Sequence, residues 1–473
     1  MRKFRKHLLF LIHFADNYMK SKSEFKEEYK EICDLAFSYA VSNMNENICE
    51  EPNIKNWTKE NKTKFLSLVN EGFKKAQNEI IDQIIFYQEK LAIAKIELKT
   101  SRKNRDKNLE KEIKSNIDLI LYRLKLLSYI MDGIAWQLFG GQTFITKRFY
   151  IGETPKTLTN SNILHVKNVA DKINEDPLQF ALISDLTNFV QIGDLVIKRK
   201  NGVGISELKE GKINEELIEI KNKIYQSDIS NEIINNTIKE LDKKKLEQLQ
   251  RMLKQDARMQ DAIDVVNNEE GNDHKTGKEI KIISNESPTH YYHNEILRTI
   301  SGLSDKNWAY LVDDLSIIHI GAYKPDSYIL SNIAIRAILD EQSKNYIIAD
   351  YKQIINATSQ PIFAKPLPPE IINEILFDDI RIIIGIDLTM FFERFEEIFG
   401  IKTEFLSRKE TKKLLEENKE NAKNFFAIDN RAIKFVNPKN GNYVILGGGI
   451  ISKLLFDNYH PISIFEYINE LLN

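Results

Sequence analysis

Hydrophobic residues recur at helical spacing through the first 130 residues of the chain. Two apolar stripes, over residues 65–87 and 117–130, have hydrophobic positions three and four residues apart. This spacing places apolar side chains on one face of a helix. The stretch between the stripes, residues 99–108, is strongly polar and basic, and we interpret it as a solvated tip rather than a phosphate contact. The pattern therefore predicts a helical domain over residues 1–130, built around a long helical hairpin.

From residue 131 the pattern changes to short apolar runs separated by glycines and turn residues. The apolar run at residues 180–187 is predicted to be a helix. Three strands are predicted to follow it, near residues 189–190, over 192–198 and over 203–209. Residues 200–203, Lys-Asn-Gly-Val, supply the turn that would join the last two strands as a hairpin.

Helices and strands alternate in the rest of the chain. A charged, helix-prone segment spans about residues 215–266, and strand patterns return at 308–312 and 315–322. We take the second of these strands as a candidate for the final strand of the hairpin's sheet. Further elements are predicted as strands at 346–349 and 381–386 and helices at 391–399 and 409–424. The predicted fold class is α/β (mixed), with domains over residues 1–130, 131–325 and 326–473.

Composition sets limits on function. The chain has 473 residues, enough for several domains, and its 42% hydrophobic and 29% charged residues are ordinary for a globular protein. The net charge of −2 gives no overall positive field, so a nucleic-acid partner must be bound by local basic patches. No segment approaches the roughly 20 apolar residues of a membrane span. The apolar run at residues 7–14 lacks a cleavage site and is predicted to be an amphipathic helix. We interpret the two cysteines as reduced thiols and expect a cytoplasmic protein.

The clearest chemical pattern lies on the predicted hairpin. Asp194 sits between apolar neighbours on the first strand, a position that disfavours a carboxylate unless it is paired or binds a metal. On the second strand Glu207 and Lys209 flank Leu208, so their side chains point to the same face. Because the turn lays the two strands side by side, Asp194 and Glu207 are predicted to converge, with the Lys209 ammonium beside them.

This combination suits the hydrolysis of phosphodiester bonds. Two carboxylates bind Mg²⁺ or Mn²⁺ through hard oxygen ligands, and the Leu208 carbonyl is a further candidate ligand. A bound metal acidifies the attacking water and neutralises charge on the phosphoryl oxygens. Lys209 would orient or deprotonate that water and stabilise the transition state.

The Glu-x-Lys spacing has no diagnostic value by itself, because it recurs elsewhere in the chain, as in Glu279-Ile-Lys281. The copy at Glu207 differs because it ends a β-branched strand that follows a turn, with Asp194 upstream. On these residues, and on the helices predicted before and after them, residues 131–325 resemble the PD-(D/E)XK nuclease superfamily of restriction enzymes, resolvases and repair nucleases. The resemblance implies a core of one helix, three strands, a second helix and a final strand. It also implies that Asp194 and Glu207 bind the metal and that Lys209 is catalytic.

The resemblance implies further site residues. Some members add an acidic residue from the first helix, for which Asp185 is the first candidate and Asp132 the second, although a helix cap or a surface carboxylate also fits both. Other members use a glutamine and a basic residue on the helix after the catalytic strand. Gln248 and Arg251 are the corresponding substrate-binding candidates, and an inserted segment must separate them from Lys209.

We interpret two other patterns as structural and not as functional sites. His290 and His293 have a spacing that can bind a metal, but no third ligand lies nearby in the sequence, which favours surface or packing histidines. Asp313 and Asp314 follow a short apolar run and are interpreted as the turn between two strands.

The sequence thus predicts a restriction-endonuclease-like core with an N-terminal helical region and a C-terminal α/β domain. The predicted function is metal-dependent hydrolysis of DNA, and the resemblance suggests bacterial defence against foreign DNA. One alternative is a catalytically silent nucleic-acid-binding or protein-interaction scaffold with the same fold. Another is a helical adaptor joined to an unrelated α/β domain. A protein partner or self-association is left open, and no membrane partner is expected.

Overall fold

The computed structural model describes most of the chain. The described residues are 21–44, 53–141, 148–152, 158, 163–199, 202–208, 212–225, 241–272, 277, 279–281, 289–331, 333–355, 359–417 and 425–473. They combine helices with four sheets, which agrees with the predicted mixed α/β class. The chain divides into two compact units: unit 1 is Met1–Ile130 with Lys172–Phe180, and unit 2 is Met131–Asp171 with Ala181–Asn473. Among the described helices, none is long and apolar enough to cross a membrane.

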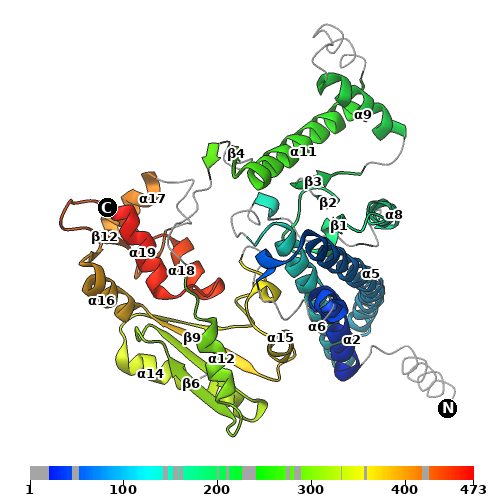
Figure 1. The fold of residues 1–473 in the computed structure, drawn as a ribbon. Helices are drawn as coiled ribbons and strands as arrows, with labels where there is room; N and C mark the ends of the chain where they lie inside the picture. The colour runs from blue at the N-terminus through cyan, green and yellow to red at the C-terminus, as the bar shows by residue number, and fades with distance from the viewer. Residues whose placement is uncertain are drawn as a thin grey trace, which may run out of the picture. The chain divides into compact units, whose positions relative to one another are not determined.

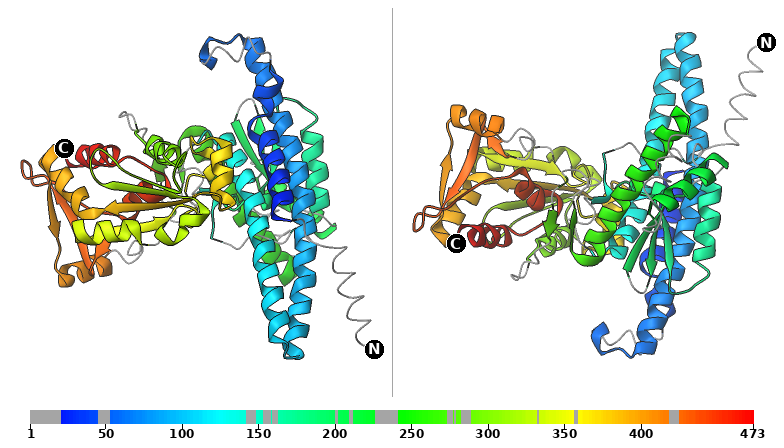
Figure 2. Two further views of the ribbon diagram at one scale, coloured as in Figure 1. Left: turned by 90° about the horizontal axis from the view of Figure 1, so that it is seen from below. Right: turned by 90° about the horizontal axis from the view of Figure 1, so that it is seen from above.

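Unit 1 is built from helices (Figure 1). Its elements are α2 (Lys22–Phe37), α3 (Tyr39–Asn43), the 3₁₀ turn η1 (Ile54–Asn56), α5 (Lys59–Lys103) and most of α6 (Lys107–Leu138). Figure 2 shows α5 and α6 running side by side, joined by a tight turn, which confirms the predicted helical hairpin. The starts of α2 and α5 have local causes, since Ser21 forms a capping box with Glu24 and the Thr58 hydroxyl accepts the Asn61 N–H. The helix predicted at residues 7–14 lies outside the described residues.

A buried arginine holds the core of unit 1. The Arg123 guanidinium donates to the Tyr87 hydroxyl at 3.1 Å and lies over the Phe25 ring, 4.7 Å from its centroid. Aromatic faces and hydrogen-bond acceptors together compensate a charge that would otherwise be expensive to bury. The Tyr29 hydroxyl donates to the Leu126 carbonyl at 3.0 Å, so α2 is bonded directly to α6.

The first sheet of unit 2 contains the predicted hairpin. Its strands are β1 (Phe180–Ile183), β2 (Leu195–Arg199) and β3 (Gly202–Ser206), in the order β1-β2-β3. β2 and β3 are antiparallel, with Leu195 opposite Ser206 and Arg199 opposite Gly202. The prediction of a helix at residues 180–187 was wrong: the run begins with β1 and continues as the 3₁₀ turn η3 (Ser184–Leu186). All four residues of β1 are buried, and a short apolar run covered on both faces has no periodicity that separates strand from helix. The strand predicted near residues 189–190 does not form.

Helices before and after this sheet frame the hairpin. α8 (Ile163–Ile173) precedes β1, and α9 (Lys212–Tyr225) and α11 (Lys243–Asn268) follow β3. A cluster of Leu217, Ile220, Leu249 and Met252 packs α9 against α11. The Asn267 amide bonds both backbone groups of Val203, each at 3.0 Å, and so fixes the C-terminal end of α11 to β3. A small hairpin of β4 (Glu270–Asn272) and β5 (Glu279–Lys281) comes next.

The C-terminal region, residues 289–473, contains an antiparallel sheet of order β6-β7-β9-β8. These strands are β6 (Trp308–Val312), β7 (Ile318–Tyr323), β8 (Tyr346–Asp350) and β9 (Arg381–Asp387). β7 is buried along its whole length between β6 and β9. The proposal that residues 315–322 complete the hairpin's sheet was therefore wrong. Asp313 and Asp314 occupy the turn between β6 and β7, as predicted.

A second sheet and a set of helices complete the C-terminal region. The sheet consists of β10 (Lys402–Phe405), β11 (Ala427–Ile428), β12 (Arg431–Val436) and β13 (Tyr443–Ile445), all paired around β12. The helical elements are α12 (His293–Ser301), η4 (Pro325–Ser327), α13 (Tyr328–Ser331), α14 (Ala334–Gln342), η5 (Ile362–Ala364), α15 (Pro369–Leu376), α16 (Leu388–Phe399), α17 (Arg408–Glu417), α18 (Gly448–Phe456) and α19 (Pro461–Leu472). Stacking of Phe395 on Phe465, with ring centroids 5.0 Å apart, packs α16 against α19.

Candidate active site

The β2–β3 hairpin brings Asp194 to the residues that follow β3. The Asp194 N–H donates to the Ser206 carbonyl at 2.8 Å, and the Ser184 N–H donates to the Asp194 carbonyl at 3.0 Å. The Leu208 N–H donates to Asp194 Oδ2 at 2.7 Å. Asp194 is thus fixed through its backbone and its carboxylate to the end of β3. Leu208 directly follows Glu207, so the structure places the Asp194 carboxylate beside the peptide bond that joins Glu207 to Leu208.

Gly193 allows this approach. Its φ of +74° lies in the left-handed region, and a Cβ added there would lie 2.3 Å from Ile205 Cγ2. A side chain at this position would therefore be strained in its backbone and would collide with β3. The Gly-Asp pair in the sequence has a geometric cause: the chain must pass close to β3 immediately before Asp194.

Glu207 is half-buried at the end of β3, next to α11. Its Oε1 accepts a hydrogen bond of 3.4 Å from Gln255 Nε2. The long distance indicates a weak bond that constrains the carboxylate only loosely. Lys209 lies outside the described residues, so the structure does not test its predicted position.

The hairpin offers oxygen donors suited to a hard cation. Asp194 and Glu207 both contribute carboxylates, and the Leu208 N–H orients one of them through a short, charge-assisted hydrogen bond. Hydrogen-bonded carboxylates of this kind are typical ligands of Mg²⁺ and Mn²⁺. Two carboxylates are the type of donor that Mg²⁺ and Mn²⁺ prefer, and the predicted binding of such a metal by Asp194 and Glu207 stays a prediction. For Leu208 the structure shows that its N–H donates to Asp194, whereas the role of its carbonyl as a metal ligand stays a prediction.

The two acidic candidates outside the hairpin differ in surroundings. Asp185 is half-buried in η3, directly after Ser184, whose N–H bonds Asp194. Asp132, on α6, is buried and accepts from both the backbone N–H and the side-chain amide of Asn188, each at 2.7 Å. Burial raises the pKa of Asp132 to about 7, although hydrogen bonds from Asn188 and Phe189 oppose the shift. Asp132 therefore holds the loop after η3 through Asn188.

The two substrate-binding candidates lie on α11 as expected, and α9 supplies the inserted segment. Gln248 donates to Asn214 of α9 at 2.5 Å, and Arg251 donates to the Glu247 carbonyl of its own helix at 3.4 Å. The glutamine that reaches the site is Gln255, two helical turns after Gln248. Sequence reasoning missed it, although residues seven apart share a helix face and this offset could have identified it.

Comparison with known proteins adds no family to this picture. The chain has no significant match among protein-family models, curated proteins or solved structures. The functional argument therefore depends on the chemistry of the described residues.

Proposed function

We propose that the chain is a metal-dependent nuclease of the PD-(D/E)XK type that hydrolyses phosphodiester bonds in DNA. The observation that carries the proposal is the 2.7 Å bond between the Leu208 N–H and the Asp194 carboxylate. This bond joins the Asp194 carboxylate, just before β2, to the Glu207–Leu208 peptide, just after β3. The order of α8, the three-stranded sheet, α9 and α11 along the chain supports the same proposal.

Each residue has a defined task in this proposal. Asp194 and Glu207 bind Mg²⁺ or Mn²⁺, and the Leu208 N–H keeps the Asp194 carboxylate oriented toward the end of β3. A metal bound there supplies an acidified water and charge neutralisation for the phosphate. Lys209 orients that water and stabilises the developing charge on the phosphoryl oxygens. Gln255 of α11 makes a weak contact with Glu207.

The test is cleavage of supercoiled plasmid DNA in Mg²⁺ or Mn²⁺. Metal-dependent nicking is expected from the wild type and should fall at least 100-fold in Glu207→Gln and Lys209→Met, a loss in the range seen when a catalytic acid–base or electrostatic group is removed. Glu279→Gln is the matched control, because Glu279-Ile-Lys281 has the same spacing on the exposed strand β5. Full activity is expected from this control.

Two results would contradict the proposal. Nicking that survives in Glu207→Gln would remove the hairpin from catalysis. A wild type that binds DNA but cleaves neither DNA nor RNA in either metal would indicate the silent scaffold instead.

A further inference from the structure

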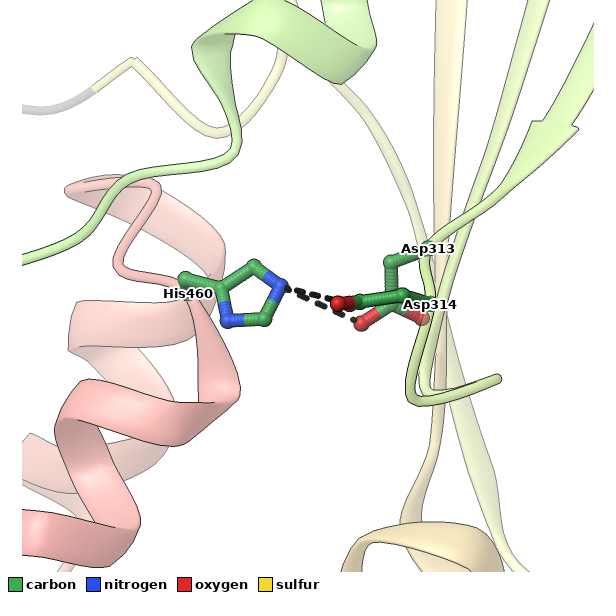
Figure 3. Close-up of side chains that lie close together, drawn as sticks. All are labelled: Asp313, Asp314 and His460. Atoms are coloured by element: carbon green, nitrogen blue, oxygen red, sulfur yellow. Dashed lines mark ion pairs between the residues drawn. The ribbon is translucent and has the colours of Figure 1, made fainter.

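A second group of metal-binding side chains lies in the C-terminal region. Asp313 and Asp314 occupy the turn between β6 and β7, and His460 immediately precedes α19 as its N-cap (Figure 3). One ligand atom from each residue lies within 4.8 Å of the other two. Figure 3 shows the His460 ring directed at the two carboxylates.

Asp313 is held with one oxygen directed at this group. Its Oδ1 accepts the backbone N–H groups of Ile317 and Ile318, at 2.6 and 2.7 Å. Its Oδ2 is buried and has no hydrogen-bond partner among the described residues, and the side chain is only 1% exposed. A buried carboxylate oxygen without a partner is unfavourable and requires a compensating group. The nearest candidate, His460 Nε2, lies 3.6 Å away, beyond hydrogen-bonding range.

The two distances from the His460 nitrogen match those between ligands of a small cation. His460 Nε2 lies 3.3 Å from Asp314 Oδ1 and 3.6 Å from Asp313 Oδ2. Bonds of 2.0–2.2 Å in tetrahedral geometry place ligand atoms about 3.3–3.6 Å apart. Direct hydrogen bonds between nitrogen and oxygen are shorter, mostly about 2.7–3.2 Å. The geometry therefore fits a shared ion better than direct bonding.

We propose that Asp313 Oδ2, Asp314 Oδ1 and His460 Nε2 bind a divalent transition-metal ion of the Zn²⁺ class. One imidazole nitrogen with two carboxylates suits Zn²⁺ better than Mg²⁺, which prefers oxygen ligands alone. The two N–H bonds to Asp313 Oδ1 are the orienting contacts that metal-binding carboxylates commonly have. Asp314 is 82% exposed, so the ion is reachable from solvent. The ion ties the β6–β7 turn to the start of α19, and the proposal does not depend on nuclease activity.

Metal binding would change which ring nitrogen of His460 carries the proton. Its Nδ1 accepts the Ile462 N–H at 3.3 Å, which places the proton of a neutral ring on Nε2. A neutral imidazole bound to metal through Nε2 carries its proton on Nδ1 instead. Binding therefore breaks the weak Ile462 contact. His460→Asn separates the two roles, since asparagine still caps a helix but is too short to replace the imidazole ligand.

The test uses full-length protein carrying Asp194→Asn and Glu207→Gln, so that the hairpin does not bind metal strongly. After removal of metal by a chelator, Zn²⁺ is titrated by calorimetry, and bound zinc is counted by elemental analysis. We expect one strong Zn²⁺ site, weakened about 100-fold or more by Asp314→Asn or His460→Asn. Asp305→Asn, which removes an exposed carboxylate before β6, should leave the affinity unchanged.

Asp314→Asn keeps the test decisive if His460→Asn does not fold, because Asp314 is at the surface. Zn²⁺ should also raise the melting temperature of the starting protein but not that of Asp314→Asn. Equal Zn²⁺ affinity in all variants, or no strong site in the folded starting protein, would overturn the proposal.

Discussion

Replacing Gly193 with alanine tests whether the close approach to β3 holds Asp194 in place. The residue has a φ of +74°, and the new Cβ would lie 2.3 Å from Ile205 Cγ2 and 3.2 Å from the Ser206 carbonyl oxygen. The left-handed backbone costs about 1–2 kcal/mol for a residue with a Cβ. The collision adds about 1–3 kcal/mol, as in other overpacked sites. Gly193→Ala should therefore destabilise the hairpin by about 2–5 kcal/mol.

Two further variants separate these contributions. Gly204→Ala, on β3, adds the same methyl group where no described atom lies within 4 Å and where φ is not positive, so its effect should stay within about 0.5 kcal/mol. In an Ile205→Ala background the 2.3 Å collision with Ile205 Cγ2 disappears, and only the 3.2 Å contact with the Ser206 carbonyl remains. Gly193→Ala should then cost mainly the free energy of the left-handed backbone. The difference between its cost in the wild type and its cost in Ile205→Ala is the coupling energy of the two residues.

The assay is hydrogen exchange of peptides that span β2 and β3, measured in the full chain. A local method is needed because a chain with two compact units is not expected to unfold in one step. A loss of about 2 kcal/mol corresponds to roughly 30-fold faster exchange through local opening. Equal exchange in Gly193→Ala and Gly204→Ala, or no relief in the Ile205→Ala background, would refute this reasoning.

Two buried ionisable groups give pH predictions of opposite sign. Burial raises the pKa of Asp132 from 3.8 to about 7, so the folded state binds an extra proton between these values and stability should fall as pH rises through this window. The slope reaches about 1.4 kcal/mol per pH unit and should be absent in Asp132→Asn, as melting temperatures at pH 5 and 7.5 would show. Burial lowers the pKa of Lys365 from 10.5 to about 7, so the unfolded state binds the extra proton and wild-type stability should rise, relative to Lys365→Met, between pH 7 and 10. Thermal unfolding measures this difference. In the folded state Asn458 and the Phe456 carbonyl accept hydrogen bonds from the ammonium and favour its charged form. If stability fell instead over this range, these bonds would outweigh burial and the predicted role of burial would be contradicted.

Local patterns in the sequence were enough to predict several elements. The helical hairpin of α5 and α6 follows from two long apolar stripes with a polar segment between them. The β2–β3 hairpin follows from two β-branched runs around a glycine turn. In both cases the elements are joined by a short connection, so a local pattern also determines which element pairs with which.

Predictions failed where pairing depends on distant parts of the chain. The run at 180–187 has apolar residues on both faces, and only its neighbour β2 makes it a strand. Residues 315–322 were correctly predicted as a strand but assigned to the wrong sheet. β9, which pairs with the edge of β7 opposite β6, comes much later in the chain. The residues around β7 therefore do not indicate this pairing.

The candidate sites also differ in whether their residues are near or far apart in the sequence. The approach of Asp194 to the residues after β3 was predictable because a hairpin turn lies between them, and the shared metal stays a prediction. His460 was not predictable, because it reaches Asp313 and Asp314 only through the docking of α19, and nothing near the two aspartates in the sequence indicates a histidine. The other histidine pattern, His290 and His293, was interpreted as surface or packing histidines, and the structure buries His293, whose pKa burial lowers to about 3.

The two proposed metal sites affect how any activity measurement should be interpreted. The hairpin offers carboxylates suited to Mg²⁺, whereas the β6–β7 turn and His460 offer a mixed set suited to Zn²⁺. A chelator strips both ions, so loss of cleavage in EDTA cannot by itself assign catalysis to the hairpin. The assignment requires the variants: Glu207→Gln should abolish cleavage and leave Zn²⁺ binding intact, and Asp314→Asn should do the reverse. If Asp314→Asn also abolished cleavage, the Zn²⁺ site would be required for activity, and the hairpin alone would not explain the reaction.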